Sequence, residues 1–136
     1  MEKTLATDIR LLTSDKVMEI HSDLAERYGL PAYGTNPEVR DAEALKRVLA
    51  RIAALSSDTR GLAAIAGEYL FDLIVEHPFV DANRRTAAAC ALYFLELNGV
   101  DAVIDDHLLE EVLAAVSAGR MNRAAVCEFI SRFVQR

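Results

Sequence analysis

The chain has no tryptophan, only two cysteines and only three prolines among its 136 residues. Proline interrupts helices, so its scarcity leaves long stretches in which helices can form. No apolar run approaches the roughly 18 residues that a membrane-spanning helix needs, and the N-terminal segment lacks the apolar core of a signal peptide. We therefore expect a cytoplasmic protein that is not bound to a membrane, in which Cys90 and Cys127 stay reduced.

Positive charge is also scarce, since 15 Lys and Arg residues stand against 21 Asp and Glu residues, for a formal net charge of -6. A chain this acidic is not expected to bind nucleic acids directly or to attach to anionic membranes. Apolar residues, in contrast, make up 52% of the chain, which excludes an intrinsically disordered protein. The length suits one domain, residues 1–136, with a buried core.

Apolar residues recur at helical spacing, and the alternating pattern of strands is missing. We expect about six helices, which start near Thr13, Asp41, Ser57 or Asp58, Arg84, Asp105 or Asp106, and just before Val126. The fourth is apolar nearly all round, which is typical of a helix packed on several sides. The sequence thus predicts a compact all-α domain around a buried central helix, with residues 29–40 as its longest irregular segment and as a mobile flap.

Several residues have structural interpretations. Gly61 and Gly67 fall inside the expected third helix, where glycine costs about 1 kcal/mol relative to alanine, so we expect another helix to approach closely. His21 lies on an apolar stripe and is expected to be a core histidine with satisfied hydrogen bonds. His107 is expected to be solvated, and the charged pairs of the outer helices are expected to form ordinary solvated faces.

One segment combines an imidazole, a carboxylate, an amide and two guanidiniums, and it reads His77-Pro78-Phe79-Val80-Asp81-Ala82-Asn83-Arg84-Arg85-Thr86. Polar groups rarely gather between two apolar helices unless they hold a ligand. The proline ends the third helix, and the two arginines open the fourth. We expect Phe79 to point into the core and to leave Asp81 and Asn83 on the same side as His77.

The start of the fourth helix can bind phosphate, because its first N–H groups lack helical partners and carry a partial positive charge. Ala82, Asn83 and Arg84 would supply these amides, and Asn83 can adopt a positive φ if the turn requires one. Arg84 and Arg85 add charge-assisted, fork-shaped donors.

Two more side chains suit phosphate chemistry. Asp81 is a hard oxygen ligand for Mg²⁺ between phosphate oxygens, and His77 can take a proton from an attacking hydroxyl. The His and Cys spacing of zinc sites is missing. Structural alternatives are that His77 bonds the backbone at a helix end, that Asp81 caps the fourth helix, and that the two arginines form surface ion pairs.

The segment resembles the pattern His-x-Phe-x-Asp/Glu-Gly/Ala-Asn-x-Arg of the Fic/Doc family. The matching residues are His77, Phe79, Asp81, Ala82, Asn83 and Arg85. Val39-Arg40-Asp41 with Leu45 and Val48-Leu49-Ala50-Arg51 look like a segment of Doc-like members, and Leu97-Asn98-Gly99 looks like the end of their central helix.

Two positions favour the Doc branch of toxins. Adenylyltransferase members have a glycine where this chain has Arg84 and a second arginine where it has Ala88, whereas Doc toxins have a lysine at the first of these positions. The resemblance implies transfer of the γ-phosphate of ATP to a threonine of translation elongation factor Tu, which inhibits translation and arrests growth. It also implies that His77, Asp81 and Arg85 are catalytic, that Asp81 binds Mg²⁺, and that residues 82–85 hold the nucleotide.

The family's inhibitory helix has the pattern Ser/Thr-x-x-x-Glu-Gly/Asn, and no glutamate here precedes a glycine or an asparagine. The resemblance therefore implies inhibition by a separate antitoxin. A segment of this antitoxin would lie in a groove near residues 29–40 and would cover the motif. Two other functions remain open. One is transfer of AMP to a protein hydroxyl, and the other is a non-catalytic member that binds nucleotide or acts as a regulator.

Overall fold

The computed structural model describes residues 9–27, 39–55 and 61–134. This part of the chain forms six helices: α1 (Ser14–Arg27), α2 (Ala42–Leu55), α3 (Leu62–Glu76), α4 (Asn83–Leu97), α5 (Asp106–Ser117) and α6 (Arg123–Ser131). It contains no strand, only two isolated β-bridges, which pair Val39 with Phe79 and Ala102 with Val134. The prediction of an all-helical single domain of about six helices is confirmed. None of the described helices is both long enough and apolar enough to cross a membrane.

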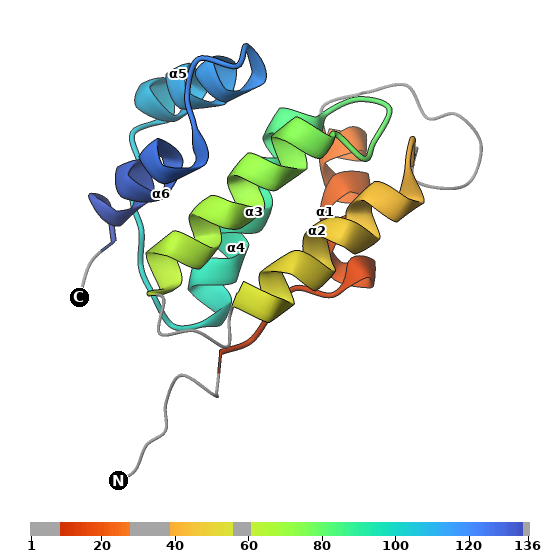
Figure 1. Cartoon of the computed structure of the whole chain (residues 1–136), viewed down its shortest axis with the longest axis horizontal. Helices are drawn as coiled ribbons and strands as arrows, with labels where there is room; N and C mark the ends of the chain where they lie inside the picture. Colours follow the sequence, from red (N-terminus) through yellow and green to blue (C-terminus); the bar gives the residue numbers. More distant parts are fainter. Residues whose placement is uncertain (1–8, 28–38, 56–60, 135–136) are drawn as a thin grey trace, which may run out of the picture.

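Helices α3 and α4 run antiparallel at the centre, with α1 and α2 on one side and α5 and α6 on the other (Figure 1). The buried face of α4 consists mainly of small residues, so neighbouring helices can approach it closely. On α3, almost every residue from Ile65 to Ile74 is buried. The prediction that α4 is central is confirmed, and α3 is equally central. The loop between these two helices contains the motif, so the fold holds the motif at both ends.

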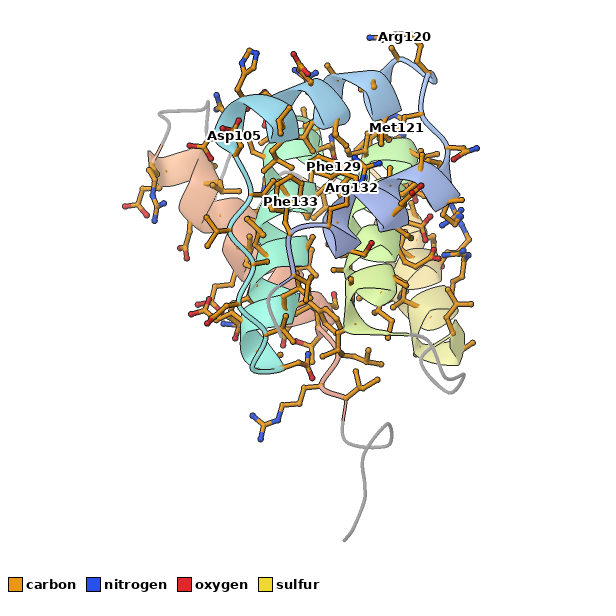
Figure 2. All side chains as sticks on the ribbon, turned by 90° about the vertical axis from the view of Figure 1, so that its left-hand side faces the viewer. Asp105, Arg120, Met121, Phe129, Arg132 and Phe133 are labelled. Carbon is orange, nitrogen blue, oxygen red and sulfur yellow. The ribbon has the colours of Figure 1, made fainter. Side chains whose placement is uncertain are left out.

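Helix α6 packs against α3, and in Figure 2 it lies beneath α5. Figure 2 shows Met121, Phe129 and Phe133 gathered between these helices, while Arg120 lies at the outer end of the turn that joins them. The rings of Phe129 and Phe133 lie 5.1 Å apart and are tilted against each other. Helix α5 itself contacts α3 and α4.

Short polar side chains begin four of the helices, as the sequence predicts for three of them. Each accepts a hydrogen bond from a backbone N–H three residues later, and this bond satisfies one of the free donors at a helix start. The four residues are Thr13 before α1, Asp41 before α2, Asp105 before α5 and Asn122 before α6. Gly99 and Gly119 follow α4 and α5 with φ of +78° and +76°, which glycine adopts without strain.

The expected start of the third helix was wrong. Ser57 and Asp58 lie outside the described residues, and α3 begins at Leu62 with Gly61 as its N-terminal cap. Gly61 is therefore not inside the helix, and no atom would lie within 4 Å of a Cβ at this position. Gly67 does lie inside α3, where a Cβ would lie 2.8 Å from the Cα of Cys127 in α6. The predicted close approach is confirmed for this glycine alone. The expected flap falls mostly on residues 28–38, which lie outside the described part.

Buried carboxylates tie three helices together, and the sequence analysis missed them. Glu68 and Asp72 are buried in α3. Arg123 of α6 lies 2.7 Å from both carboxylates, and Arg51 of α2 lies 3.0 Å from Glu68 and 2.5 Å from Asp72. The expectation that the charged residues of the outer helices form only solvated faces was therefore wrong for Arg51 of α2 and Arg123 of α6. It is right for His107, whose exposed ring pairs with Glu111.

We predict that Gly67→Ala destabilises the protein by about 1–3 kcal/mol, because the added methyl group would overpack the interface between α3 and α6. Chemical denaturation would measure the free energy of unfolding. Cys127→Ala removes the sulfur atom that would lie 2.7 Å from the new Cβ but leaves the backbone of residue 127 equally close to it. The double variant should therefore recover only part of the loss. A gain in stability in Gly67→Ala would contradict the close approach.

Candidate functional site

His77 lies at the end of α3, where the chain turns sharply. It is the residue that follows the helix, with φ of +29° and ψ of 72°, and its ring is exposed. Few residues other than glycine adopt a positive φ, so surrounding contacts must hold this turn. The ring Nδ1 lies 3.2 Å from the carbonyl oxygen of Val75, whereas Nε2 accepts no hydrogen bond from the described residues. The alternative that His77 only bonds the backbone at a helix end thus explains the position of Nδ1 but not that of Nε2.

Arg40 holds the backbone of this turn. Its Nε donates to the carbonyl oxygen of His77 at 2.8 Å, and its Nη2 donates to that of Glu76 at 3.0 Å. Carbonyl groups at a helix end lack partners within the helix, and a cation near them also opposes the negative end of the helix dipole. The backbone N–H groups of Arg40 and Asp41 both donate to the carbonyl oxygen of Pro78. The start of α2 therefore fixes the position at which α3 ends.

Phe79 anchors the loop in the core, as predicted, because its side chain is 1% exposed. Its ring stacks on the ring of His21 from α1, with centroids 3.9 Å apart and an angle of 6° between the planes. Its backbone pairs with Val39 in an isolated bridge. Segments far apart in the sequence thus meet at one aromatic side chain.

Asn83 closes the loop. Its side-chain oxygen accepts from the N–H of Phe79 at 3.0 Å, and its side-chain nitrogen donates to the carbonyl oxygen of Phe79 at 3.0 Å. The sequence allowed a positive φ at Asn83 if the turn required one, but the positive φ occurs one residue earlier: Asn83 is the first residue of α4, and Ala82 before it has φ of 62°. An L-residue in this conformation costs about 1–2 kcal/mol, which the paired hydrogen bonds of Asn83 can offset. The side chain of Asn83 therefore shapes the loop, and its backbone N–H is one of the first amides of α4.

Among the described residues, no side chain caps the start of α4, so this part of the chain leaves its first amides available to a ligand. Asp81 is half-buried, and no hydrogen bond or ion pair joins its carboxylate to the described residues. The structural alternative that Asp81 caps α4 is therefore not supported. Arg84 and Arg85 are both exposed in the first turn. Positive side chains oppose the helix dipole at this end unless an anion lies nearby.

A cavity of about 780 Å³ lies between the motif and α5. It is lined by five of the six predicted site residues, which are His77, Ala82, Asn83, Arg84 and Arg85. Asp81 is not among the lining residues, although it directly precedes Ala82. The structure thus brings an imidazole, a helix start and two guanidiniums to one cavity, with the carboxylate next to it.

The opposite wall belongs to α5 and was missed by the sequence analysis. Glu110, Leu113, Val116 and Ser117 line it, and Ile74 and Val75 of α3 continue its apolar part. Nothing in the spacing of α5 distinguishes these residues from those of any amphipathic helix. One side of the cavity is cationic, and the other combines an apolar part with the polar side chains of Glu110 and Ser117. This arrangement suits a ligand that combines phosphate groups with an aromatic ring.

The described residues contain no group of three or more His, Cys, Asp or Glu side chains that could hold a metal ion. Mg²⁺ in phosphate-transfer sites commonly binds only one or two carboxylates, together with phosphate oxygens and water. The single carboxylate of Asp81 therefore fits a Mg²⁺ ion that arrives with a nucleotide, and it does not fit an ion held by the protein alone.

Comparison with known proteins agrees with this geometry. The pattern described as the Fic/DOC family matches residues 11–95, which include the complete motif. The chain belongs to the Fic/DOC family. It is also 30% identical over 125 residues to a protein of Escherichia phage P1 called "Protein kinase doc", and this match covers 91% of the chain and 95% of the phage protein. The resemblance to the Doc branch that the sequence analysis found is confirmed.

In this Fic/DOC chain we predict that Arg40→Met lowers the free energy of unfolding by about 1 kcal/mol, because two carbonyl groups at the end of α3 lose charged donors. Chemical denaturation would measure the change. Arg47→Met is a matched control, since Arg47 pairs with the exposed carboxylate of Glu76 at 3.4 Å and should contribute little. Equal effects of the two substitutions would argue against a specific role for Arg40.

Proposed function

We propose that this chain is a protein kinase of the Doc type, which transfers the γ-phosphate of ATP to a hydroxyl group of a protein. The observation that carries the proposal is the cavity in which His77, the start of α4 and two arginines meet. The name of the related phage protein supports the same reaction. So do Arg84 and Ala88, which replace the glycine and the second arginine of the adenylylating pattern.

The proposed reaction assigns one task to each residue. His77 accepts the proton of the target hydroxyl, whose oxygen forms a bond to the γ-phosphorus while the bond to the bridging oxygen of ADP breaks. The backbone N–H groups of Ala82, Asn83 and Arg84 bind phosphate oxygens at the start of α4. The guanidiniums of Arg84 and Arg85 stabilise negative charge on the transferred group.

Asp81 is the residue that would hold Mg²⁺. When bound, this ion neutralises phosphate charge and orients the nucleotide. The carboxylate is suited to the task because no described side chain competes for it. The apolar wall formed by Ile74, Leu113 and Val116 is suited to the nucleotide base.

The Doc resemblance also supports a biological setting. In the proposed setting the chain is the toxin of a toxin–antitoxin pair and acts in the cytoplasm, where it modifies a threonine of elongation factor Tu and arrests growth by inhibiting translation. The proposed inhibitor is a separate antitoxin that covers the cavity, because the glutamate pattern of a built-in inhibitory helix is missing from the sequence.

Labelled ATP tests which phosphate moves. We expect the purified chain, incubated with Mg²⁺ and a bacterial lysate, to transfer label from γ-labelled ATP to one protein band without any activating partner. His77→Ala should lower this transfer by about 10²–10⁴-fold, because the general base is lost. Label from the α-phosphate would instead show AMP transfer, and label from neither would favour a non-catalytic member. Circular dichroism would show that His77→Ala is folded.

Nucleotide titration tests the remaining site residues. We expect Mg²⁺ to strengthen ATP binding to the wild-type chain about tenfold or more, and Asp81→Asn to remove this dependence on the metal. Arg85→Ala should weaken binding about tenfold or more both with and without Mg²⁺, because it removes a charged phosphate donor. Arg132→Ala is a control outside the cavity. If the affinity for ATP changes neither with Mg²⁺ nor with these substitutions, the proposed site is excluded.

A further inference from the structure

His21 of α1 is buried directly beneath the motif. It is 2% exposed, its ring stacks on Phe79, and its Nε2 lies 3.1 Å from the carbonyl oxygen of Asp81. The carbonyl oxygen can only accept, so Nε2 carries the proton and donates it. The sequence analysis expected a core histidine with all hydrogen bonds satisfied, and this was wrong, because the buried Nδ1 has no partner among the described residues.

An unpaired polar atom in the interior is costly, and it calls for an explanation. A phenylalanine at this position would keep the stacking on Phe79 and would remove the unpaired Nδ1, but it would leave the carbonyl oxygen of Asp81 without its donor. The buried imidazole thus has one unpaired nitrogen and makes one hydrogen bond to the motif. The imidazole differs from phenylalanine in one useful respect, the hydrogen bond from Nε2 to Asp81.

The backbone on either side of Asp81 is already fixed by other contacts. Asn83 binds both the N–H and the carbonyl group of Phe79, and the carbonyl oxygen of Ala82 accepts from the N–H of Thr86 in α4. Between them, Val80 is exposed. Among the described residues, the bond from His21 is the only one that holds the carbonyl group of Asp81. Losing it would free this peptide group to rotate, and the carboxylate of Asp81 would move with it.

We propose that His21 is a positioning residue, which holds the main chain of Asp81 so that the carboxylate is directed toward the phosphates and their metal ion. This inference rests on the proposed function for the role of Asp81 in binding Mg²⁺ with ATP. The positioning itself depends only on the hydrogen bond and the stacking. Residues that orient a metal ligand in this way typically change metal affinity about 10–100-fold when they are replaced.

Two substitutions separate positioning from stability. His21→Phe keeps an aromatic ring against Phe79 but removes the donor to Asp81. It should leave the melting temperature near that of the wild type, because removal of the unpaired Nδ1 offsets the lost hydrogen bond, while it raises the KM for Mg·ATP about tenfold. His21→Gln keeps a donor at the position of Nε2 but loses the stacking. It should lower the melting temperature while keeping the KM within about threefold of wild type, well below the change in His21→Phe. If KM instead follows stability in both variants, the role of His21 is structural and the proposal is overturned.

A measurement without catalysis distinguishes a failure of this inference from a failure of the proposed function. Amide hydrogen exchange at residues 80–83 should be about tenfold faster in His21→Phe than in wild type, and near wild type in His21→Gln. His107→Phe, which changes an exposed histidine in α5, is the matched control and should leave exchange unchanged. Unchanged exchange in His21→Phe would overturn the positioning role. Faster exchange in a chain that transfers no phosphate would overturn the proposed function and support the positioning role.

Discussion

The candidate site depends on the burial of one ring, that of Phe79. With this ring in the core, the loop after α3 cannot move away from α1 and α2 without exposing apolar surface, which costs about 1.5–3 kcal/mol for a side chain of this size. Each polar contact of the loop then acts on a segment that is already anchored: His21 from below, the start of α2 from one side, and Asn83 from within the loop. The site is shaped by hydrophobic anchoring first and by hydrogen bonding second.

The two ends of the loop are held by different means. The end at α3 is stabilised by Arg40, which supplies the donors that the last carbonyl groups need. The end at α4 begins with a strained alanine and has no side-chain cap, so its first amides are available. This asymmetry suits a binding site, because one helix end is satisfied by the protein and the other is left for an anion. The positive charge of Arg84 in the first turn opposes the helix dipole, and a bound phosphate would make this charge favourable.

Beneath the site, buried charges set the relative positions of the helices. Glu68 and Asp72 would be costly alone in the interior, and they are tolerated because Arg51 and Arg123 reach them from opposite sides. The geometry that satisfies these carboxylates also places α6 against Gly67. The helix that carries these carboxylates, α3, also contacts α5, which forms the far wall of the cavity.

The sequence by itself determined the local features: the helical spacing, the caps at Thr13, Asp41 and Asp105, and the inward position of Phe79. It also predicted the candidate site residues and indicated the family, because one contiguous motif carries both. The tertiary structure alone decided the positive φ at Ala82, the incomplete hydrogen bonding of His21 and the wall that α5 contributes. The physical reason is how far along the chain the interacting residues lie from one another. A cap or an apolar stripe depends on neighbours within a few residues, whereas a cavity wall or a bond between α1 and the motif depends on how distant helices pack.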